Sequence, residues 1–210
     1  MKVLVSGCSS TGTTLMINIM PYFFNSEVLL EDEVHPYNKL AYNEKGKLFV
    51  IKKPAQTKSN PDYFDPRYLL RSGWKLIWMI RDGRDTLCSL NEKGKYHTST
   101  KRFIEVNEML HEVALDDNVH IIRYEALVQY PQKAIKTLSL FLGAGYQKDF
   151  LSFYHRMDVA SPMNIGIKSR PIDKNSIGNY KNHPDRGKKL KRSIYYKRFC
   201  KIQNMMGYEV

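Results

Sequence analysis

A short apolar strand, a loop of small residues and an apolar helix open the chain, and this pattern constrains the fold more than any other feature. The strand is expected over residues 2–6, the loop covers residues 7–14 (GCSSTGTT), and apolar helix-forming residues follow at once. Glycines let the backbone turn sharply and approach a ligand, and amide groups at a helix N-terminus point toward an anion. The pattern predicts a strand–loop–helix unit that binds a phosphate or sulfate group.

Short β-branched runs alternate with longer helical patterns along the rest of the chain, as in βαβ units around a parallel sheet. The run over residues 75–80 is almost entirely apolar, which is typical of a central strand covered by helices on both faces. We therefore expect an α/β fold of three layers, a mostly parallel β-sheet flanked by helices. Strands are expected over 2–6, 27–30, 48–52, 75–80 and 119–123, and helices over about 12–24, 62–71, 84–94, 100–115, 131–142, 147–156 and 186–206.

The composition favours a single domain over residues 1–210, because the chain has ordinary apolar content, no internal repeat and no low-complexity linker. Its three cysteines lack the spacing of a disulfide framework or a zinc site, so we expect no metal and a reducing compartment. No apolar run reaches the length of a membrane span, and the strand at the start leaves no room for a signal peptide. We expect a cytoplasmic protein without a membrane span.

The chain is strongly basic, with 33 Lys and Arg against 21 Asp and Glu and a net charge of +12. Much of the excess lies in the expected helix 186–206, whose apolar stripe includes Phe199 and Ile202. This basic amphipathic helix is either the solvated outer face of a packed helix or a docking surface for an anionic partner. No known nucleic-acid-binding motif accompanies the charge, so we expect no specific nucleic acid as a partner.

The loop over residues 7–14 has the spacing of the phosphate-binding loop of nucleotide triphosphatases, G-x-x-x-x-G-K-[ST], with one difference. Thr13 stands where that motif has its lysine. Without the lysine, NTP hydrolysis or a kinase reaction lacks its main cationic partner for the β- and γ-phosphates. The loop therefore predicts anion binding and argues against an ordinary NTPase.

The same loop resembles the 5′-phosphosulfate-binding loop of the sulfotransferases that use 3′-phosphoadenosine 5′-phosphosulfate (PAPS). The resemblance implies a P-loop NTPase-like sulfotransferase fold, with PAPS as cosubstrate, adenosine 3′,5′-bisphosphate (PAP) as product and no required metal. It implies that Ser10, Thr11, Gly12, Thr13 and Thr14 bind the cosubstrate. The family usually has Lys or Arg where this chain has Ser10, so the sequence departs from the pattern at a position that contacts the transferred group.

Three later stretches add to the resemblance. Arg81 ends an expected strand and Ser89 follows eight residues later on the next expected helix, as in the family's 3′-phosphate motif. An arginine can fork onto a phosphate and a serine can add a hydroxyl donor. The resemblance further implies that Tyr124 lies near the adenine, and that Tyr180 and Lys181 belong to a segment that closes over the cofactor. Tyr180 replaces the usual tryptophan of that segment.

The catalytic residues are less well defined by the sequence. Lys52 and Lys53 stand where the family often has a strand-end lysine, and either of them would supply positive charge to the departing phosphate. An acceptor hydroxyl must also lose a proton to a nearby base. Glu31 and Glu33 are the candidates for that base, with His35 third, because relatives that act on glycans and tyrosines resemble this chain in placing a Glu after the second strand.

The residues together favour a sulfotransferase that moves a sulfuryl group from PAPS to a hydroxyl of an unidentified acceptor: a glycan, a small alcohol or phenol, or a tyrosine. Acceptor specificity is expected in the loops 34–47, 54–64 and 157–175. Two alternatives stay open: a P-loop kinase-like NTP enzyme, and a non-catalytic protein that binds nucleotides or nucleic acid. The sequence does not determine the oligomeric state.

Overall fold

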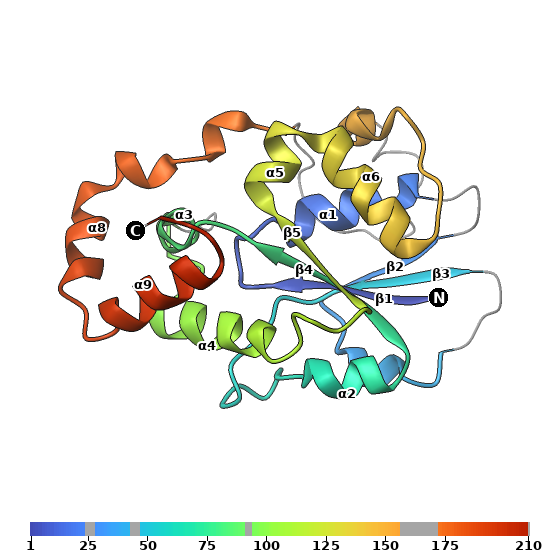
Figure 1. Ribbon diagram of the computed structural model, residues 1–210, viewed down its shortest axis with the longest axis horizontal. Coiled ribbons are helices and arrows are strands. Elements are labelled where there is room, and N and C mark those ends of the chain that lie inside the picture. Colours follow the sequence, from blue (N-terminus) through green and yellow to red (C-terminus); the bar gives the residue numbers. More distant parts are fainter. Residues whose placement is uncertain (24–27, 43–46, 91–93, 156–171, 210) are drawn as a thin grey trace.

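The computed structural model describes the chain except residues 24–27, 43–46, 91–93, 156–171 and 210, so most of the expected specificity loop 157–175 lies outside the described residues. Its centre is a sheet with the strand order β2-β3-β1-β4-β5, in which every described pair is parallel (Figure 1). All five expected strands form. They are β1 (Lys2–Gly7), β2 (Val28–Asp32), β3 (Leu48–Lys52), β4 (Trp74–Ile80) and β5 (Val119–Arg123).

Helices cover both faces of this sheet, which gives the expected three layers (Figure 1). One face packs against α1 (Thr13–Ile19), α5 (Tyr124–Gln129) and α6 (Pro131–Leu142). The other packs against α2 (Pro66–Arg71), α4 (Thr100–His111) and α9 (Tyr196–Met205). The part of the chain that the structure describes also contains α3 (Gly83–Cys88), α8 (Pro184–Lys191) and the 3-10 turns η1 (Met20–Tyr22), η2 (Pro36–Lys39), η3 (Phe150–His155), η4 (Lys174–Ser176) and η5 (Asn179–Asn182).

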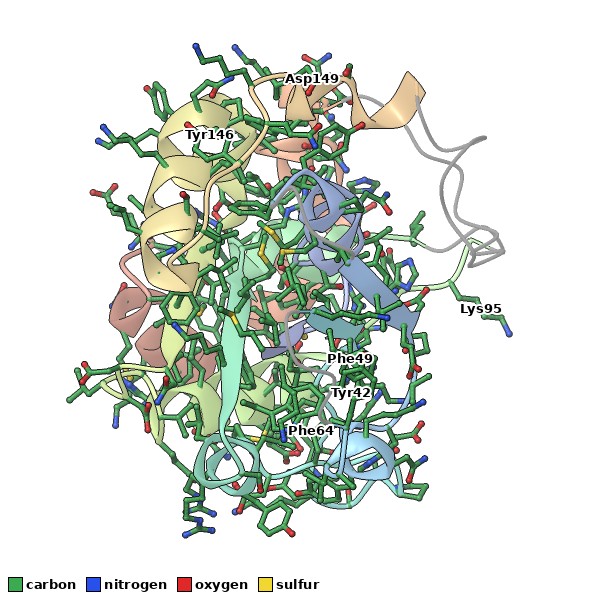
Figure 2. All side chains as sticks on the ribbon, turned by 90° about the vertical axis from the view of Figure 1, so that its right-hand side faces the viewer. Tyr42, Phe49, Phe64, Lys95, Tyr146 and Asp149 are labelled. Atoms are coloured by element: carbon green, nitrogen blue, oxygen red, sulfur yellow. The ribbon has the colours of Figure 1, made fainter. Side chains whose placement is uncertain are left out.

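Alternation along the central strands divides the core into two halves. Val3 and Val5 of β1 face the layer of α1, α5 and α6, whereas Leu4 faces the layer of α2, α4 and α9. On this second side, Tyr42 stacks on Phe49 of β3 with a ring-centroid distance of 4.1 Å (Figure 2). Both faces of β1 are thus buried, as its apolar sequence requires in a parallel sheet.

Several helices are shorter than their sequence patterns suggested. The α-helix expected over 12–24 ends at Ile19 and continues as a 3-10 turn, because Pro21 has no amide hydrogen to donate to an α-helical bond. The helix expected over 84–94 ends at Cys88, where the chain turns and the carbonyl of Ser89 accepts a hydrogen bond from the amide of His97. Within the described residues, no helix has the length and apolarity needed to cross a membrane.

The single C-terminal helix expected over 186–206 is instead two helices, α8 and α9, joined by a turn at residues 192–195. In one continuous helix, Leu190 and Phe199 would point in nearly opposite directions, because nine residues correspond to two and a half turns. The turn lets both side chains pack into the same half of the core. Burial of these two residues therefore favours the break over a continuous helix.

Two helical glycines offer a test of this packing. A Cβ atom on Gly83 of α3 would lie 2.6 Å from both Phe103 and Phe199, whereas a Cβ on Gly187 of α8 would meet nothing within 4 Å. We expect Gly83→Ala to lower the free energy of unfolding by about 1–3 kcal/mol, because it overpacks the core. Gly187→Ala is expected to raise it by about 0.5–1 kcal/mol, through helix propensity. Denaturant unfolding of both variants measures this difference, and equal effects would contradict the packing of α3 against α4 and α9.

Candidate functional site

The loop after β1 is a tight turn held against β4. A Cβ atom on Gly7 would lie 2.3 Å from the carbonyl oxygen of Met79, so only glycine fits there. Ser10 and Gly12 have φ angles of 70° and 97°, in the left-handed region. The Thr11 hydroxyl donates a hydrogen bond to the carbonyl of Cys8 at 2.7 Å and closes the turn. The loop leads directly into α1, as the sequence predicts.

Cys8 is a structural residue within this loop. Its side chain is fully buried, with Sγ 3.5 Å from the Thr98 hydroxyl. Burial raises the pKa of the Cys8 thiol above its ordinary value, because the thiolate would lose its hydration. Cys8 is therefore a neutral thiol at physiological pH, and it does not offer a nucleophile to a ligand of the loop.

Arg81, the first residue after β4, lies beside the same loop. Its guanidinium donates hydrogen bonds to the carbonyl oxygens of Ser10, at 3.2 Å, and Ser176, at 2.6 Å. The side chain is only 10% exposed, and its Nε is buried without a hydrogen-bond partner among the described residues. A buried cation with one unused donor next to a small-residue loop is suited to receive an anionic group.

Tyr124 connects the loop to Arg81. Its ring packs so closely on the loop that a Cβ on Gly12 would lie 2.5 Å from the ring, and the Arg81 guanidinium stacks 4.4 Å from the ring centroid. The Tyr124 hydroxyl is 2.8 Å from the Ser176 hydroxyl. The structure thus brings together three sequence-predicted residues from three separate parts of the chain.

Asp85 of α3 fixes the segment that carries Ser176 and Tyr180. Its carboxylate accepts hydrogen bonds from the backbone amides of Gly178 and Tyr180, each at 2.8 Å, and one oxygen lies 3.8 Å from the Arg81 guanidinium. The Asp85 side chain is 1% exposed. A buried carboxylate needs such donors to offset the loss of its hydration. Asp85 therefore holds residues 176–180 over Arg81, and the sequence analysis did not identify it.

A second polar network ties the chain after β4 to the C-terminal helix. The side-chain amide of Gln203 accepts a hydrogen bond from the amide of Gly83 and donates one to Asp82, both at 2.9 Å. Glu125 accepts bonds from the amide of Asp82, at 2.9 Å, and the Tyr208 hydroxyl, at 2.7 Å. Burial and the adjacent Glu125 carboxylate raise the pKa of Tyr208, so its hydroxyl stays a donor. The position of Arg81 thus depends on residues more than 120 positions later.

Lys52, at the end of β3, reaches the loop from the other side. Its ammonium lies 3.5 Å from the Thr14 hydroxyl, 2.6 Å from the Asp32 carboxylate and 2.9 Å from the Glu33 carboxylate. The Lys52 side chain is 6% exposed, whereas that of Glu33 is 53% exposed. Glu33 also has a φ angle of 58°, a strained backbone conformation for this residue type. The structure therefore holds one buried cation and two carboxylates at the loop.

The side chains of the other catalytic candidates have other partners and do not reach the loop. The β2–β3 register pairs Glu31 with Ile51, on the face opposite to Lys52, and Glu31 forms an ion pair with Lys39 at 2.7 Å. Lys53 donates to the carbonyl of Glu33 and lies 3.5 Å from Asp62. His35 is bonded to the carbonyl of Tyr63 and lies at the start of η2. Of the candidates, only Lys52 and Glu33 meet at the loop.

Two cofactor candidates also differ from their expected surroundings. Ser89 follows the last residue of α3 and has extended backbone angles, so it is not on the helix where the sequence placed it. Lys181, in η5, is exposed. Tyr180 is held by its backbone amide, and its ring stacks on the Arg84 guanidinium at 4.4 Å. These three residues, like the other cofactor candidates, stay predictions as cofactor ligands.

Asp32 is the carboxylate that the sequence analysis missed at this site. Side chains alternate along a strand, so Asp32 shares the face of Lys52, its register partner, and Glu31 does not. This alternation was the signal available in the sequence, once the pairing of β2 with β3 was assumed. Among the residues that the structure describes, no group of three or more His, Cys, Asp or Glu is arranged to hold a metal ion.

Comparisons with known proteins relate this geometry to a class of fold. No protein-family model and no curated protein sequence matches the chain. Among solved structures it is similar to mouse sulfotransferase SULT7A1 complexed with PAP, with a TM-score of 0.66 and 15% identity over 96% of this chain and 84% of that one. It is also similar to the sulfotransferase domain of the Synechococcus PCC 7002 olefin synthase, with a TM-score of 0.66 and 13% identity over 100% of this chain and 95% of that one. The sulfotransferase domain of the curacin biosynthetic pathway is similar too, with a TM-score of 0.64 and 15% identity over 100% of this chain and 98% of that one. The chain therefore has the P-loop NTPase-like fold of the sulfotransferases, as expected.

Asp85→Asn tests how residues 176–180 are held. An asparagine has one acceptor oxygen in place of two, and its amide group would face a backbone amide donor, so we expect the segment to loosen. Hydrogen exchange at the amides of Gly178 and Tyr180 is expected to become about tenfold faster or more, with a loss of roughly 1.5–3 kcal/mol in unfolding free energy. Asp185→Asn, at a carboxylate that is 96% exposed, is the control and should change neither quantity. Unchanged exchange in Asp85→Asn would contradict this role.

Proposed function

We propose that this protein is a sulfotransferase that transfers the sulfuryl group of PAPS to a hydroxyl of an acceptor and releases PAP. The observation that carries the proposal is the meeting of the loop after β1 with Lys52 on one side and Arg81 on the other. Two buried cations thus lie at a loop whose sequence predicts anion binding, in the fold of the sulfotransferases. A nucleotide with phosphates at both its 5′ and 3′ ends suits two such cations.

The proposed roles follow from the position of each group. The loop amides and the hydroxyls of Thr13 and Thr14 bind the 5′-phosphosulfate, and Arg81 binds the 3′-phosphate with its free Nε and with donors released from backbone carbonyls. Tyr124 offers its ring beside Arg81 for the adenine. The carbonyl of Ser176 accepts a hydrogen bond from the Arg81 guanidinium. The segment that carries Ser176 must therefore shift, or turn this carbonyl away, when the phosphate binds.

Lys52 is proposed to stabilise the charge that develops during transfer. The acceptor oxygen forms a bond to sulfur while the bond from sulfur to the bridging oxygen of PAP breaks, and negative charge grows on that bridging oxygen. An ammonium next to Thr14 is suited to this task. Ser10 replaces the basic loop residue that is common in the family. Lys52 is therefore the cation proposed to act on the 5′-phosphosulfate of PAPS in this chain.

Glu33 is the proposed base that takes the proton of the acceptor hydroxyl. Its carboxylate lies at Lys52 and is half exposed, so an acceptor can reach it, whereas Asp32 is 15% exposed and lies 2.6 Å from the same ammonium. Asp32 is therefore proposed to orient Lys52. Glu31 is not kept in this role, because it faces the other side of the sheet and pairs with Lys39.

Binding of PAP is the first test of the proposal. We expect calorimetry to show micromolar affinity for PAP and at least tenfold weaker binding of adenosine 5′-phosphate, which lacks the 3′-phosphate. Arg81→Ala is expected to remove most of that preference, while Arg71→Ala, at an exposed arginine of α2, should leave it intact. Stronger binding of ATP with magnesium than of PAP would contradict the proposal and support a kinase-like enzyme.

Transfer itself is tested with radiolabelled PAPS and a panel of phenols, alcohols and glycans. On any acceptor that is labelled, Lys52→Ala and Glu33→Gln are expected to lower kcat by about 100-fold or more, with PAP binding largely retained in Glu33→Gln. Glu31→Gln should keep most of the activity, because its carboxylate lies on the opposite face. If Glu31→Gln lowered kcat as much as Glu33→Gln does, the assignment of Glu33 as the base would be contradicted.

A further inference from the structure

The region around α8 and α9 carries most of the excess charge of the chain. Residues 181–201 contain nine Lys and Arg and one acidic residue, Asp185, a net of +8 in a chain whose net charge is +12. Figure 1 shows α8 at one end of the molecule, with α9 next to it and beside α4. Apart from Lys181, which stays a predicted cofactor ligand, these charges have no role in the binding of PAPS proposed above.

The two helices pack several apolar residues against the core and turn most of their basic residues outward. Leu190 of α8 and Phe199 and Ile202 of α9 pack in the core. The basic residues of the opposite faces define the α8–α9 basic face: Lys188, Lys189, Lys191, Arg192, Lys197 and Lys201. All six are exposed, and within the described residues only Lys188 has an ion pair, with the 96% exposed Asp185 at 3.6 Å.

An apolar residue stands in the turn between the two helices. Ile194 is 91% exposed, although it has basic residues on both sides in the sequence. The turn is well defined, because Ser193 accepts hydrogen bonds from the amides of Tyr195, at 3.2 Å, and Tyr196, at 3.0 Å. Tyr195 and Tyr196 are partly buried against the core, so Ile194 is the apolar side chain that this turn exposes to solvent. A single exposed isoleucine is common on protein surfaces, but Ile194 lies within the α8–α9 basic face.

We propose that the α8–α9 basic face docks the protein on an anionic membrane surface, with Ile194 entering the boundary between headgroups and acyl chains. Clustered lysines are attracted to the negative surface of anionic lipid, and an apolar side chain among them gains from leaving water. The long aliphatic stems of the lysines suit such a boundary as well. The proposal does not depend on the sulfotransferase activity.

The same face fits a nucleic acid less well. Binding to single strands uses aromatic rings on which bases stack, and the two tyrosines at this turn are partly buried against the core instead. An exposed isoleucine contributes nothing to phosphate contacts, whereas it does contribute to lipid binding. The combination of exposed lysines, of which only Lys188 has an ion pair among the described residues, with an apolar residue at the turn is therefore the observation that selects a membrane.

Sedimentation of the full chain with vesicles tests the proposal. We expect binding to phosphatidylcholine vesicles that contain about 30% phosphatidylserine and at least tenfold weaker binding to phosphatidylcholine alone, with a steep loss on addition of salt. The double variant Lys189→Glu/Lys191→Glu should bind the anionic vesicles at least tenfold more weakly. Ile194→Ser, which leaves the charge unchanged, should lose roughly threefold.

A matched double variant separates the local effect from net charge. Lys133 and Lys136 are exposed on α6, and Lys133→Glu/Lys136→Glu changes the net charge by the same amount. It should bind vesicles within about twofold of the unchanged chain, while thermal melting checks that all variants are folded. Equal losses in the two double variants, no effect of Ile194→Ser, or tighter binding of a single-stranded RNA than of the anionic vesicles would each overturn the proposal.

Discussion

The parallel pairing of β1 with β4 is the constraint on which the rest of the structure depends. It extends from Lys2 opposite Trp74 to Gly7 opposite Met79, so both strands end at the same edge of the sheet. The loop after β1 and Arg81 after β4 are neighbours for this reason alone. A shift of one residue would turn the apolar residues of β1 to the wrong faces and separate the loop from Arg81. Gly7 permits the close approach, because any side chain would collide with the backbone of Met79.

The C-terminal part of the chain completes what this pairing begins. Asp85 holds residues 176–180, and Gln203 of α9 bonds to the amide of Gly83 and to Asp82, on both sides of the turn into α3. These are buried polar contacts, which stabilise only when all partners are present. The candidate site therefore forms only when residues far apart in the sequence have docked. This couples the geometry around Arg81 to the packing of α9 on the core.

Local signals were sufficient to predict the strands, the loop and helix 131–142, which begins at Pro131 and is followed by Gly143 in a left-handed conformation. Features that depend on tertiary contacts were not predicted. The break between α8 and α9 follows from burying both Leu190 and Phe199, and Asp85 matters through amides more than 90 residues away. The finding that Asp32, and not Glu31, faces Lys52 required the register of β2 with β3. Sequence spacing alone does not contain that register.

The net charge of the chain has two separate explanations. At the candidate site each cation has a carboxylate close by: Lys52 has Asp32 and Glu33, and Arg81 has Asp85. The site therefore contributes little to the excess of +12, although a basic composition alone suggested a link to anionic ligands. The excess instead lies on α8 and α9, where the exposed lysines other than Lys188 have no ion pair among the described residues. A buried cation needs a carboxylate to offset its desolvation, whereas exposed cations stay hydrated without one and remain available to a large anionic surface.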